Sequence, residues 1–391
     1  AIVDDLQALS DDKLDLLTIS LPPGIGKLIS DDTPVLTTEG WKKHGDLKVG
    51  DYVYNHEGET VKVTNVFSKY HADYEVEFAN GEKIKVHGEH EWLLNDRSCQ
   101  KQKIFETEEL YNKKLYYGTL GKRGSRYRFH LPLRKPIQGQ FKQLPVDPYV
   151  LGVWLGNGSE TKPAITIGKD DKAVIDEVVK RGYPITSVQT HDITKVPTVY
   201  FKKLRKDLQK VGMCHSRKKW GKRIPDEYLT ANLDQRLDLL AGLMDTDGTV
   251  SGRKCLYSTT DEELRDDIIS LVSTFGWRIS YTTQEPKLSS SGIQGKKPVY
   301  VMSFTPEIVI PTVLERKRLK DLGKQRRIAL TNIRKIEPER GNCIEVEGGI
   351  YLVGRQMIPT HNSTLGIFFL SWEMGKHPMK PNLASAHSSK L

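Results

Sequence analysis

The sequence is poor in cysteine and has no long hydrophobic run. Its four widely spaced cysteines include no CxxC pair, so neither a disulfide framework nor a cysteine-rich metal site is predicted; they are Cys99, Cys214, Cys255 and Cys343. No apolar stretch approaches the roughly 20 residues that a membrane-spanning helix needs, and the first residues lack the pattern of a signal peptide. We therefore expect a cytoplasmic protein without a membrane partner.

The composition is that of a globular protein with a small excess of positive charge. Of 391 residues, 37% are hydrophobic and 28% are charged, and 59 Lys and Arg against 50 Asp and Glu leave a formal net charge of +9. At about 100–200 residues per domain, this length corresponds to two or three domains. The positive charge favours a polyanionic partner, although it is spread over the whole chain.

Segments at opposite ends of the chain look like two halves of one motif. Residues 13–21 are predicted to form a buried strand, and Gly24, Gly26 and Lys27 follow it. In a P-loop the glycine backbone cradles phosphate, the lysine reaches the outer phosphates, and the next residue is Ser or Thr, whose hydroxyl holds Mg²⁺. Here Leu28 follows the lysine, so the motif stops before its metal ligand.

The missing half of this motif stands near the other end of the chain. Ser363 and Thr364 precede a predicted amphipathic helix, and joining Lys27 to Ser363 restores the run LPPGIGKST between a strand and a helix. With Leu21 in place of the first glycine, this run resembles the Walker A region of phage large terminase subunits, and other P-loop ATPases also fit. The resemblance implies that ATP and Mg²⁺ bind only to the rejoined host protein, at Gly24, Gly26, Lys27, Ser363 and Thr364.

The residues before Ser363 have the chemistry of a self-cleaving junction. An Asn side-chain amide can attack its own carbonyl and cyclise to a succinimide, which would break the chain after Asn362. His361 can assist the proton transfer, and Ser363 supplies a hydroxyl nucleophile. An insert is therefore expected to remove itself from between two flanks, which divides the chain into 1–27, 28–362 and 363–391.

Four segments of the insert resemble the sequence blocks of inteins: 28–37, 81–90, 343–353 and 356–363. The resemblance implies the all-β Hint fold that inteins share with hedgehog autoprocessing domains, with its two parts at 28–140 and 326–362. Short alternating strands separated by turn signals, such as Asn80-Gly81, also predict an all-β splicing domain.

The first residue of the insert departs from the usual intein pattern. Inteins ordinarily begin with Cys or Ser, whereas Leu28 carries no nucleophile. Class three inteins lack that nucleophile and carry instead a Trp two residues after the second-block His, an internal Cys and a Thr near the end. Trp92, Cys343 and Thr360 match these three positions. An engineered replacement of a cysteine by Leu28 is the alternative.

The resemblance implies a splicing reaction that needs no cofactor. The Cys343 thiolate attacks the Lys27 carbonyl and forms a branched thioester, and the acyl group then moves to Ser363. Asn362 cyclises with help from His361, the insert leaves, and an ordinary Lys27–Ser363 peptide bond remains. A reactive Cys343 needs a lowered pKa or an adjacent base. Taken alone, a cysteine in an apolar β pattern is more often a small buried hydrophobe.

Two histidines of the second block compete for the role at the first junction. His90 has the family spacing and is expected to polarise or protonate the scissile amide. His87 occupies the place where this block usually has Thr, so it is the alternative. Trp92 is expected to pack around the site, and Thr360 could be a plain turn residue.

Two segments between the splicing halves resemble each other and a nuclease motif. Residues 149–158 and 239–248 both read as apolar helices with small residues on one face and an acidic or amide residue at the end. The second resembles the motif of LAGLIDADG homing endonucleases, which implies an α/β domain at 141–325 and double-stranded DNA as a partner. In that family the terminal carboxylates bind divalent metal, so Asp247 is the expected Mg²⁺ ligand.

The first of these motifs departs from the family at the catalytic position. Asn157 stands where the family has an acid, and a neutral amide binds Mg²⁺ less well than a carboxylate. Lys222 matches a family lysine near the active site. Strand nicking or lost cleavage is therefore expected rather than double-strand cutting, and helix packing without catalysis is the alternative.

A basic segment precedes the first motif. Residues 97–142 contain 12 Lys and Arg against 3 acidic residues, and interleaved aromatic residues include Tyr111, Tyr116, Tyr117, Tyr127 and Phe129. This composition is typical of a surface that contacts phosphates, and a solvated basic linker is an equal alternative.

Three functions compete on the sequence alone. The first is autocatalytic splicing by an all-β Hint domain with an inserted α/β endonuclease domain, in a chain expected to be a monomer. The second is a site-specific DNA endonuclease as the main activity. The third is a P-loop ATPase fragment interrupted by an inert insert.

Overall fold

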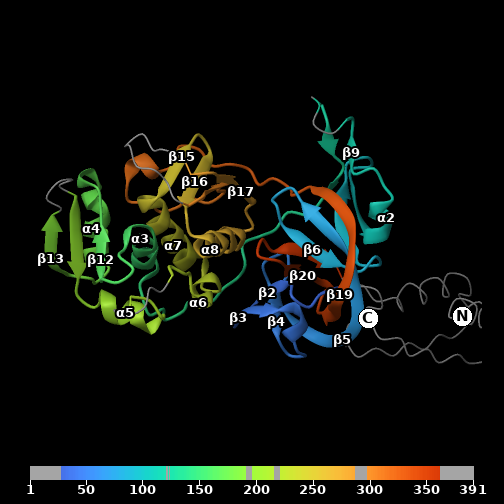
Figure 1. The fold of residues 1–391 in the computed structure, drawn as a ribbon, viewed down its shortest axis with the longest axis horizontal. Helices are drawn as coiled ribbons and strands as arrows, with labels where there is room; N and C mark the ends of the chain where they lie inside the picture. Colours follow the sequence, from blue (N-terminus) through green and yellow to red (C-terminus); the bar gives the residue numbers. More distant parts are fainter. Residues whose placement is uncertain are drawn as a thin grey trace, which may run out of the picture.

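The computed structural model describes residues 28–361 apart from 120–121, 123, 191–195, 215–220 and 287–296. Two bodies make up this part of the chain (Figure 1): a β-rich body formed by both ends of the range, and an α/β body formed by its middle. The expected site residues Gly24, Gly26, Lys27, Asn362, Ser363 and Thr364 lie outside the described residues.

The β-rich body contains a seven-stranded sheet in the order β19-β1-β6-β5-β4-β2-β3. Its long strands, β5 (Thr60–Phe78) and β19 (Leu330–Val346), pair antiparallel, so segments from the two ends of the insert share one ladder. The shorter strands are β1 (Ile29–Ser30), β2 (Pro34–Thr37), β3 (Gly40–Lys43), β4 (Tyr52–Tyr54) and β6 (Lys83–Val86).

A second sheet of the β-rich body joins the strands that carry the junction residues. Its order is β11-β7-β21-β20, with β8 also paired to β7. The strands are β7 (Glu91–Asp96), β8 (Lys101–Glu106), β11 (Phe129–His130), β20 (Ile350–Val353) and β21 (Ile358–His361). Between β8 and β11 lie the short helix α2 (Thr107–Tyr111) and the pair β9 (Tyr116–Tyr117) and β10 (Arg126–Tyr127).

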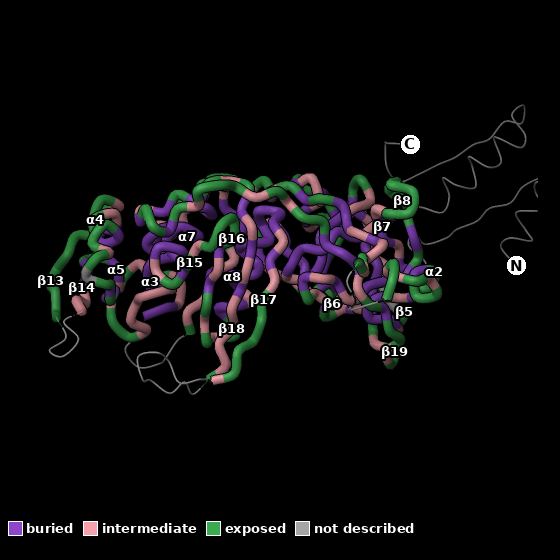
Figure 2. The backbone as a smooth tube through the Cα atoms, turned by 90° about the horizontal axis from the view of Figure 1, so that it is seen from above, coloured by how far each residue is buried: buried purple, intermediate pink, exposed green. Residues whose placement is uncertain are grey.

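Alternation along the strands places the core of the β-rich body. In β7 the side chains of Trp92 and Leu94 are buried while those of Glu91 and Leu93 are half-buried, as a period of two residues requires. Figure 2 shows the buried segments running through the interior of each body. The buried side chains form separate clusters in the two bodies, so each body has its own core.

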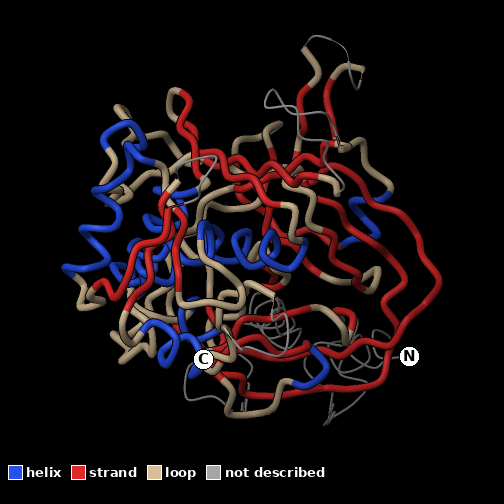
Figure 3. The backbone as a smooth tube through the Cα atoms, turned by 60° about the vertical axis from the view of Figure 1, so that its left-hand side comes forward, coloured by secondary structure: helices blue, strands red, loops and turns tan. Residues whose placement is uncertain are grey.

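The α/β body holds most of the helices (Figure 3). They are α3 (Pro148–Asn157), α4 (Lys172–Lys180), α5 (Leu204–Lys210), α6 (Asp226–Leu229), α7 (Leu233–Thr246) and α8 (Glu262–Ser273). Asp147 caps α3 by accepting from the Val150 N–H at 3.2 Å, and Asn232 caps α7 by accepting from the Gln235 N–H at 2.9 Å. These caps satisfy N–H groups that a helix start leaves without partners.

Two antiparallel sheets complete the α/β body. One has the order β12-β14-β13, from β12 (Ala164–Thr166), β13 (Ile185–Thr190) and β14 (Pro197–Phe201). The other has the order β15-β16-β18-β17, from β15 (Gly248–Ser251), β16 (Lys254–Thr259), β17 (Ile279–Gln284) and β18 (Val299–Phe304). Each sheet follows one of the two similar helices, α3 or α7, in the chain.

The two bodies meet at a buried arginine. Arg134 donates from Nη2 to the carbonyl oxygens of Gly276 at 3.4 Å and Trp277 at 3.3 Å, both in the α/β body. Its Nη1 donates to the carbonyl oxygens of Gln356 and Met357, just before β21. The guanidinium therefore ties the α/β body to the loop that leads into the second junction. None of the helices in the described ranges has the length and apolarity to cross a bilayer.

Candidate functional site

The start of the insert lies between two strands of the large sheet. In β1, Ile29 is paired with Asn342 of β19 on one side and with Val86 of β6 on the other. The antiparallel register places Leu28 level with Cys343. Gly341 is required here, because a Cβ on this residue would lie 2.7 Å from the Ile29 carbonyl oxygen.

At the first junction the structure shows a contact with His87, the alternative of the two second-block histidines. The His87 N–H donates to the Leu28 carbonyl oxygen at 3.0 Å. Leu28 and Cys343 are each 1% exposed, so the thiol lies in a space from which bulk water is excluded. The Cys343 Sγ is 3.8 Å from the Ile344 carbonyl oxygen, a weak contact with a group that cannot act as a base.

His90 contacts both Trp92, two residues away, and Thr360, which comes from the other end of the insert. His90 Nε2 lies 2.5 Å from Thr360 Oγ1, and the rings of His90 and Trp92 make an edge-to-face contact with centroids 4.9 Å apart. The Trp92 indole N–H donates to Thr107 Oγ1 at 2.9 Å, and this hydroxyl donates to the His90 carbonyl oxygen at 2.9 Å. Trp92 thus holds the His90 ring against Thr360.

The second junction has a carboxylate that the sequence analysis missed. His361 of β21 is paired with Glu91 of β7, and His361 Nδ1 lies 3.0 Å from Glu91 Oε2. Both side chains are about one-seventh exposed, at 14% and 15%. A carboxylate on one ring nitrogen fixes the tautomer and leaves the other nitrogen available as a base. Glu91 stands between His90 and Trp92 in the sequence. The alternation of side chains along a strand is the only sequence signal that Glu91 points to the opposite face from Trp92.

In the α/β body, the two similar helices pack in close contact. A Cβ on Gly152 of α3 would lie 2.2 Å from the Leu239 carbonyl oxygen, and one on Gly242 of α7 would lie 2.2 Å from the Tyr149 carbonyl oxygen. The two glycines occupy equivalent positions in the two motifs. Only glycine permits backbones to approach this closely, so the small residues of both motifs are explained by packing.

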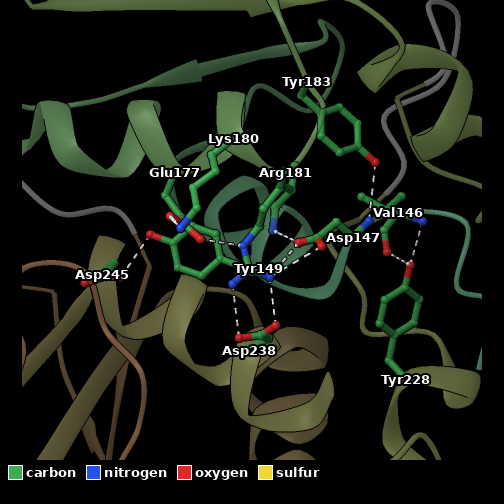
Figure 4. Close-up of polar contacts among 11 residues, drawn as sticks. Val146, Asp147, Tyr149, Glu177, Lys180, Arg181, Tyr183, Tyr228, Asp238 and Asp245 are labelled. Atoms are coloured by element: carbon green, nitrogen blue, oxygen red, sulfur yellow. Dashed lines mark hydrogen bonds and ion pairs between the residues drawn. The ribbon is translucent and has the colours of Figure 1, made fainter. Parts of the chain in front are cut away.

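The first aspartate of the second motif has a structural role. Asp245 accepts hydrogen bonds from the Tyr149 hydroxyl at 3.0 Å and from the N–H groups of Val313 and Leu314 at 2.9 and 3.1 Å. Figure 4 shows Tyr149 reaching Asp245 beside an ion-pair network in which Arg181 contacts Asp147, Glu177 and Asp238.

Asp247 follows α7 and has two lysines as neighbours. Burial raises the pKa of Asp247, while the positive charges of Lys222 and Lys317 act in the opposite direction. Lys222 Nζ donates to the Gly156 carbonyl oxygen at 2.8 Å, next to Asn157, and Lys317 Nζ donates to the Thr246 carbonyl oxygen at 3.2 Å. Burial lowers the pKa of both lysines. Sequence analysis identified Lys222 but missed Lys317, which lies 70 residues beyond Asp247.

These groups do not fit a pair of divalent ions. Asp247 supplies one carboxylate and Asn157 one neutral oxygen, while two ammonium groups stand close by. The ranges covered by the structure contain no group of three or more His, Cys, Asp or Glu residues that could hold a metal. Two-metal sites use several carboxylates to offset the ion charges, and of the two motif ends only that of α7 supplies one.

Part of the positive charge in segment 97–142 is used inside the protein. Arg128 makes two hydrogen bonds to the carboxylate of Asp96, at 2.9 and 2.8 Å, and holds the pKa of that carboxyl far below its usual range. Lys135 pairs with Glu57 at 2.5 Å. The buried Arg134 binds carbonyl groups, as described above. The basic residues left exposed include Arg97, Lys101, Lys103 and Arg126.

Comparisons with known proteins identify the inserted domain and give relatives of the whole chain. A family model described as a LAGLIDADG-like domain matches residues 234–309. A replicative DNA helicase DnaB of Mycobacterium intracellulare is 30% identical over 405 residues, which cover 96% of this chain and 65% of the helicase. A DnaB helicase of Mycobacterium leprae is 32% identical over 80 residues, or 20% of this chain and 13% of that protein. The chain thus spans less than two thirds of the length of these relatives.

Similar solved structures include an intein and a homing endonuclease. The MchDnaB-1 intein is 13% identical, covers 85% of this chain and 99% of its own, and has a TM-score of 0.25. Variants of the homing endonuclease I-DmoI are 12% identical, cover 41% of this chain and 83% of their own, and have a TM-score of 0.28. These TM-scores are too low to support an assignment. The fold is therefore assigned from the strand order, the helix pair and the family model.

The chain has a Hint splicing fold with an inserted LAGLIDADG-like domain. The predicted fold class is therefore confirmed, with the inserted domain between β11 and β19 of the Hint fold. The phage terminase resemblance of the flanks finds no counterpart among these relatives, which are described as DnaB helicases.

Proposed function

We propose that residues 28–362 excise themselves and join Lys27 to Ser363. The observation that carries this proposal is that one short segment, 87–90, touches both ends of the insert. His87 donates its N–H to Leu28 at the first junction, and His90 contacts Thr360, two residues before Asn362, at the second. The two bonds that must break are about 335 residues apart in sequence, so bringing them together is the main structural requirement of splicing.

The first step is an acyl transfer to Cys343. Its sulfur bonds to the Lys27 carbonyl carbon, the bond to the Leu28 nitrogen breaks, and that nitrogen gains a proton. Leu28 has no nucleophile, and the register that sets Cys343 beside it supports an internal cysteine as the attacking group, as in class three inteins. His90, held by Trp92 and Thr360, is placed to polarise the scissile amide.

The later steps take place at the second junction. The acyl group passes from Cys343 to the Ser363 hydroxyl, and the Asn362 side chain then attacks its own carbonyl and releases the insert. His361 transfers the proton in this step, with its ring oriented by Glu91. A shift of the acyl group from oxygen to nitrogen leaves a normal peptide bond. All groups come from the chain, so no metal, nucleotide or oxidant takes part.

We infer that the host is a replicative helicase of the DnaB type and not a terminase. The similarity to a DnaB helicase extends over 96% of this chain, flanks included. Splicing would rebuild the P-loop run LPPGIGKST, with Gly24, Gly26, Lys27, Ser363 and Thr364 as the groups that bind ATP and Mg²⁺. The inert-insert alternative leaves Leu28 at the metal-ligand position, where it cannot hold Mg²⁺.

We propose that the inserted domain binds double-stranded DNA but cleaves it poorly. Asp247 would hold Mg²⁺, and Asn157 and the two nearby lysines weaken the second half of the site. Asn157→Asp adds the missing carboxylate and should tighten Mg²⁺ binding and raise nicking of a DNA that carries the uninterrupted host site. Asp247→Asn is the matched control and should abolish both. A cytoplasmic monomer remains our expectation.

The proposal is tested by mass spectrometry of the full chain after expression. Splicing gives a ligated product of 56 residues and a free insert of 335 residues. Asn362→Ala should stop the reaction at the branched form, with the acyl group on the Ser363 oxygen as an ester that hydroxylamine would cleave. An intact chain that forms neither product nor branched form would overturn the proposal.

A further inference from the structure

A buried hydrogen-bond network holds the turn that leads into the second junction. This turn spans residues 354–357, between β20 and β21, and β21 then runs to His361, the neighbour of Asn362 in the chain. All four residues of β21 are paired with β20. Because the strand is so short and moves as one paired unit, a shift of the turn along the strand would move His361 by a similar amount.

The backbone of the turn adopts a conformation that its contacts must maintain. Met357 has a φ of 53°, in the left-handed region that a residue with a Cβ rarely adopts. The Glu82 carboxylate accepts from the N–H groups of Arg355 and Gln356, both at 3.1 Å. Gln356 Nε2 donates to the Asn80 carbonyl oxygen at 3.0 Å. The N–H side of the turn is therefore held from within the β-rich body.

Arg134 holds the carbonyl side of the turn. Its Nη1 donates to the carbonyl oxygens of Gln356 and Met357, the second at 2.8 Å. Only 5% of Arg134 is exposed, and burial lowers its pKa to about 10, so the guanidinium is still protonated at neutral pH. A charged donor makes these two bonds stronger than hydrogen bonds between neutral groups.

The other terminal nitrogen of Arg134 is anchored in the inserted domain. Nη2 donates to the carbonyl oxygens of Gly276 and Trp277, at 3.4 and 3.3 Å. Trp277 is 1% exposed and stacks on Phe275 with ring centroids 4.6 Å apart, so these carbonyl groups are fixed to the core of that domain. Gln325 Nε2 donates to the Arg134 carbonyl oxygen at 2.7 Å and also to that of Gly276, which holds the Arg134 backbone at the same place.

We propose that Arg134 is a positioning residue for the cleavage after Asn362. By joining the turn 354–357 to the core of the inserted domain, it fixes where β21 begins and therefore where His361 is placed. The inserted domain thus supports a step of splicing, the release of the insert. This inference rests on the proposed splicing reaction, and in particular on proton transfer by His361.

The test measures how fast the free insert appears from the full chain with and without Arg134→Lys. Lysine keeps the positive charge but lacks the planar fork that donates to carbonyl groups of both bodies. We expect release to slow about tenfold, within the loss that a misplacement of about 1 Å causes, and the branched ester on Ser363 to accumulate.

A second rate separates positioning from a general loss of structure. Formation of the branched ester is measured in the same chains carrying Asn362→Ala. It should fall by less than about threefold, because Trp92 and Thr107 keep His90 in place independently of the turn. An equal fall in both rates would overturn the proposal, and so would release at the parent rate.

Arg236→Lys is the matched control. Arg236 is 0% exposed, and its guanidinium donates to the carbonyl oxygens of Ala231, Thr274 and Ile137. The variant therefore loses a buried arginine of the inserted domain while the bonds from Arg134 to the turn remain. It should release the insert at the parent rate, and a tenfold slower release would overturn the assignment to Arg134.

Gln325→Ala decides the outcome if Arg134→Lys does not fold. Gln325 is only half-buried, and its loss removes the two bonds that hold the Arg134 backbone to Gly276. We expect release to slow about threefold, and the parent rate would then overturn the proposal. A parent chain that forms neither free insert nor branched ester would instead overturn the splicing reaction itself.

Discussion

The splicing body and the inserted domain build their polar sites in opposite ways. In the splicing body, the groups at the two junctions come from strands β6, β7, β19 and β21 and the turn before β7, more than 250 residues apart at the extremes. In the inserted domain, Asn157 and Asp247 sit at the ends of two helices whose motifs are visible in the sequence. The first site depends on strand register, and the second depends on backbone contact between two glycines.

This difference predicts where each body is most sensitive to mutation. A site assembled from many strands fails when one reacting atom is lost, since the rest of the sheet still folds. A site placed by a single helix pair fails when the pair is pushed apart, because both of its ends then move.

The largest effect is expected for Cys343→Ala, which should abolish both the branched thioester and the spliced product, because the proposed nucleophile is lost. Gel electrophoresis and mass spectrometry of the expressed chain measure this. Cys99→Ala is the control, since Cys99 is an exposed cysteine of the same body. Normal splicing by Cys343→Ala would show that Cys343 is not the nucleophile of the splicing body.

The next effect concerns Gly242→Ala in the helix pair. The added Cβ would lie 2.2 Å from the Tyr149 carbonyl oxygen, so the helices must separate, at a cost of about 3 kcal/mol or more in the free energy of unfolding of the inserted domain. Urea unfolding and DNA binding measure this, and splicing should persist. Gly221→Ala is the control, because its Cβ would meet only the Glu263 carboxylate, at 3.5 Å. Unchanged stability of Gly242→Ala would refute the role of close backbone packing.

A smaller effect is expected from pH at the junction of the two bodies. Glu82 accepts from the N–H groups of Arg355 and Gln356, both at 3.1 Å, and burial raises the pKa of its carboxyl to about 7. The folded state therefore holds a proton that the unfolded state releases near pH 4.5. The stability contributed by the protonated carboxyl is present below pH 4.5 and is lost as pH rises to about 7, by at most about 3 kcal/mol.

Thermal unfolding between pH 4.5 and 7.5 measures this trend, and Glu82→Gln should flatten it. The control is Glu59→Gln, an exposed residue of the same body, which should leave the slope unchanged. A stability that falls with pH at the same rate in Glu82→Gln as in Glu59→Gln would show that Glu82 does not set the trend.

The smallest effect is expected for Glu91→Gln. The amide keeps a contact with His361 but loses the negative charge beside the ring that transfers the proton, so cleavage after Asn362 should slow about tenfold, or about 1.4 kcal/mol. The measurement is the rate of release of the insert from the preformed branched ester on Ser363. Glu89→Gln, an exposed neighbour, is the matched control. If Glu91→Gln slowed branched-thioester formation instead, the carboxylate would belong to the first junction.

Sequence analysis anticipated the members of the splicing site that lie in recognisable blocks. Cys343, His90, Trp92 and Thr360 were expected from the resemblance to intein blocks and to class three inteins, and the structure places His90 in contact with both Trp92 and Thr360. Glu91 and Arg134 were not expected there, because each is an ordinary residue in an ordinary strand or loop. Their role depends on which strand or turn lies next to theirs, and local pattern carries no information about that.

The basic segment 97–142 shows that composition alone does not predict which charged side chains are exposed. Its composition predicted a surface that contacts phosphates, yet Arg128 is occupied by Asp96 and Arg134 is buried between the two bodies. A count of charges cannot separate a solvated guanidinium from one that satisfies carbonyl groups in a core. Lys317 is the converse case, since nothing near it in the sequence resembles the motif that contains Asp247.

By itself, the sequence determined the kinds of chemistry available to this protein. It supplied an internal cysteine, Cys343, in an insert whose first residue is not a nucleophile, and an asparagine and a histidine at the second junction. It also supplied two glycine-containing helices, of which only the second is followed by the acid at the motif end, Asp247. Tertiary structure decided which of these groups meet, because pairing of β1 with β19 and of β7 with β21 joins segments from opposite ends of the insert. It also decided which charged side chains bind groups inside the protein and which remain exposed, because the burial of a side chain depends on the whole chain and not on its spacing in the sequence.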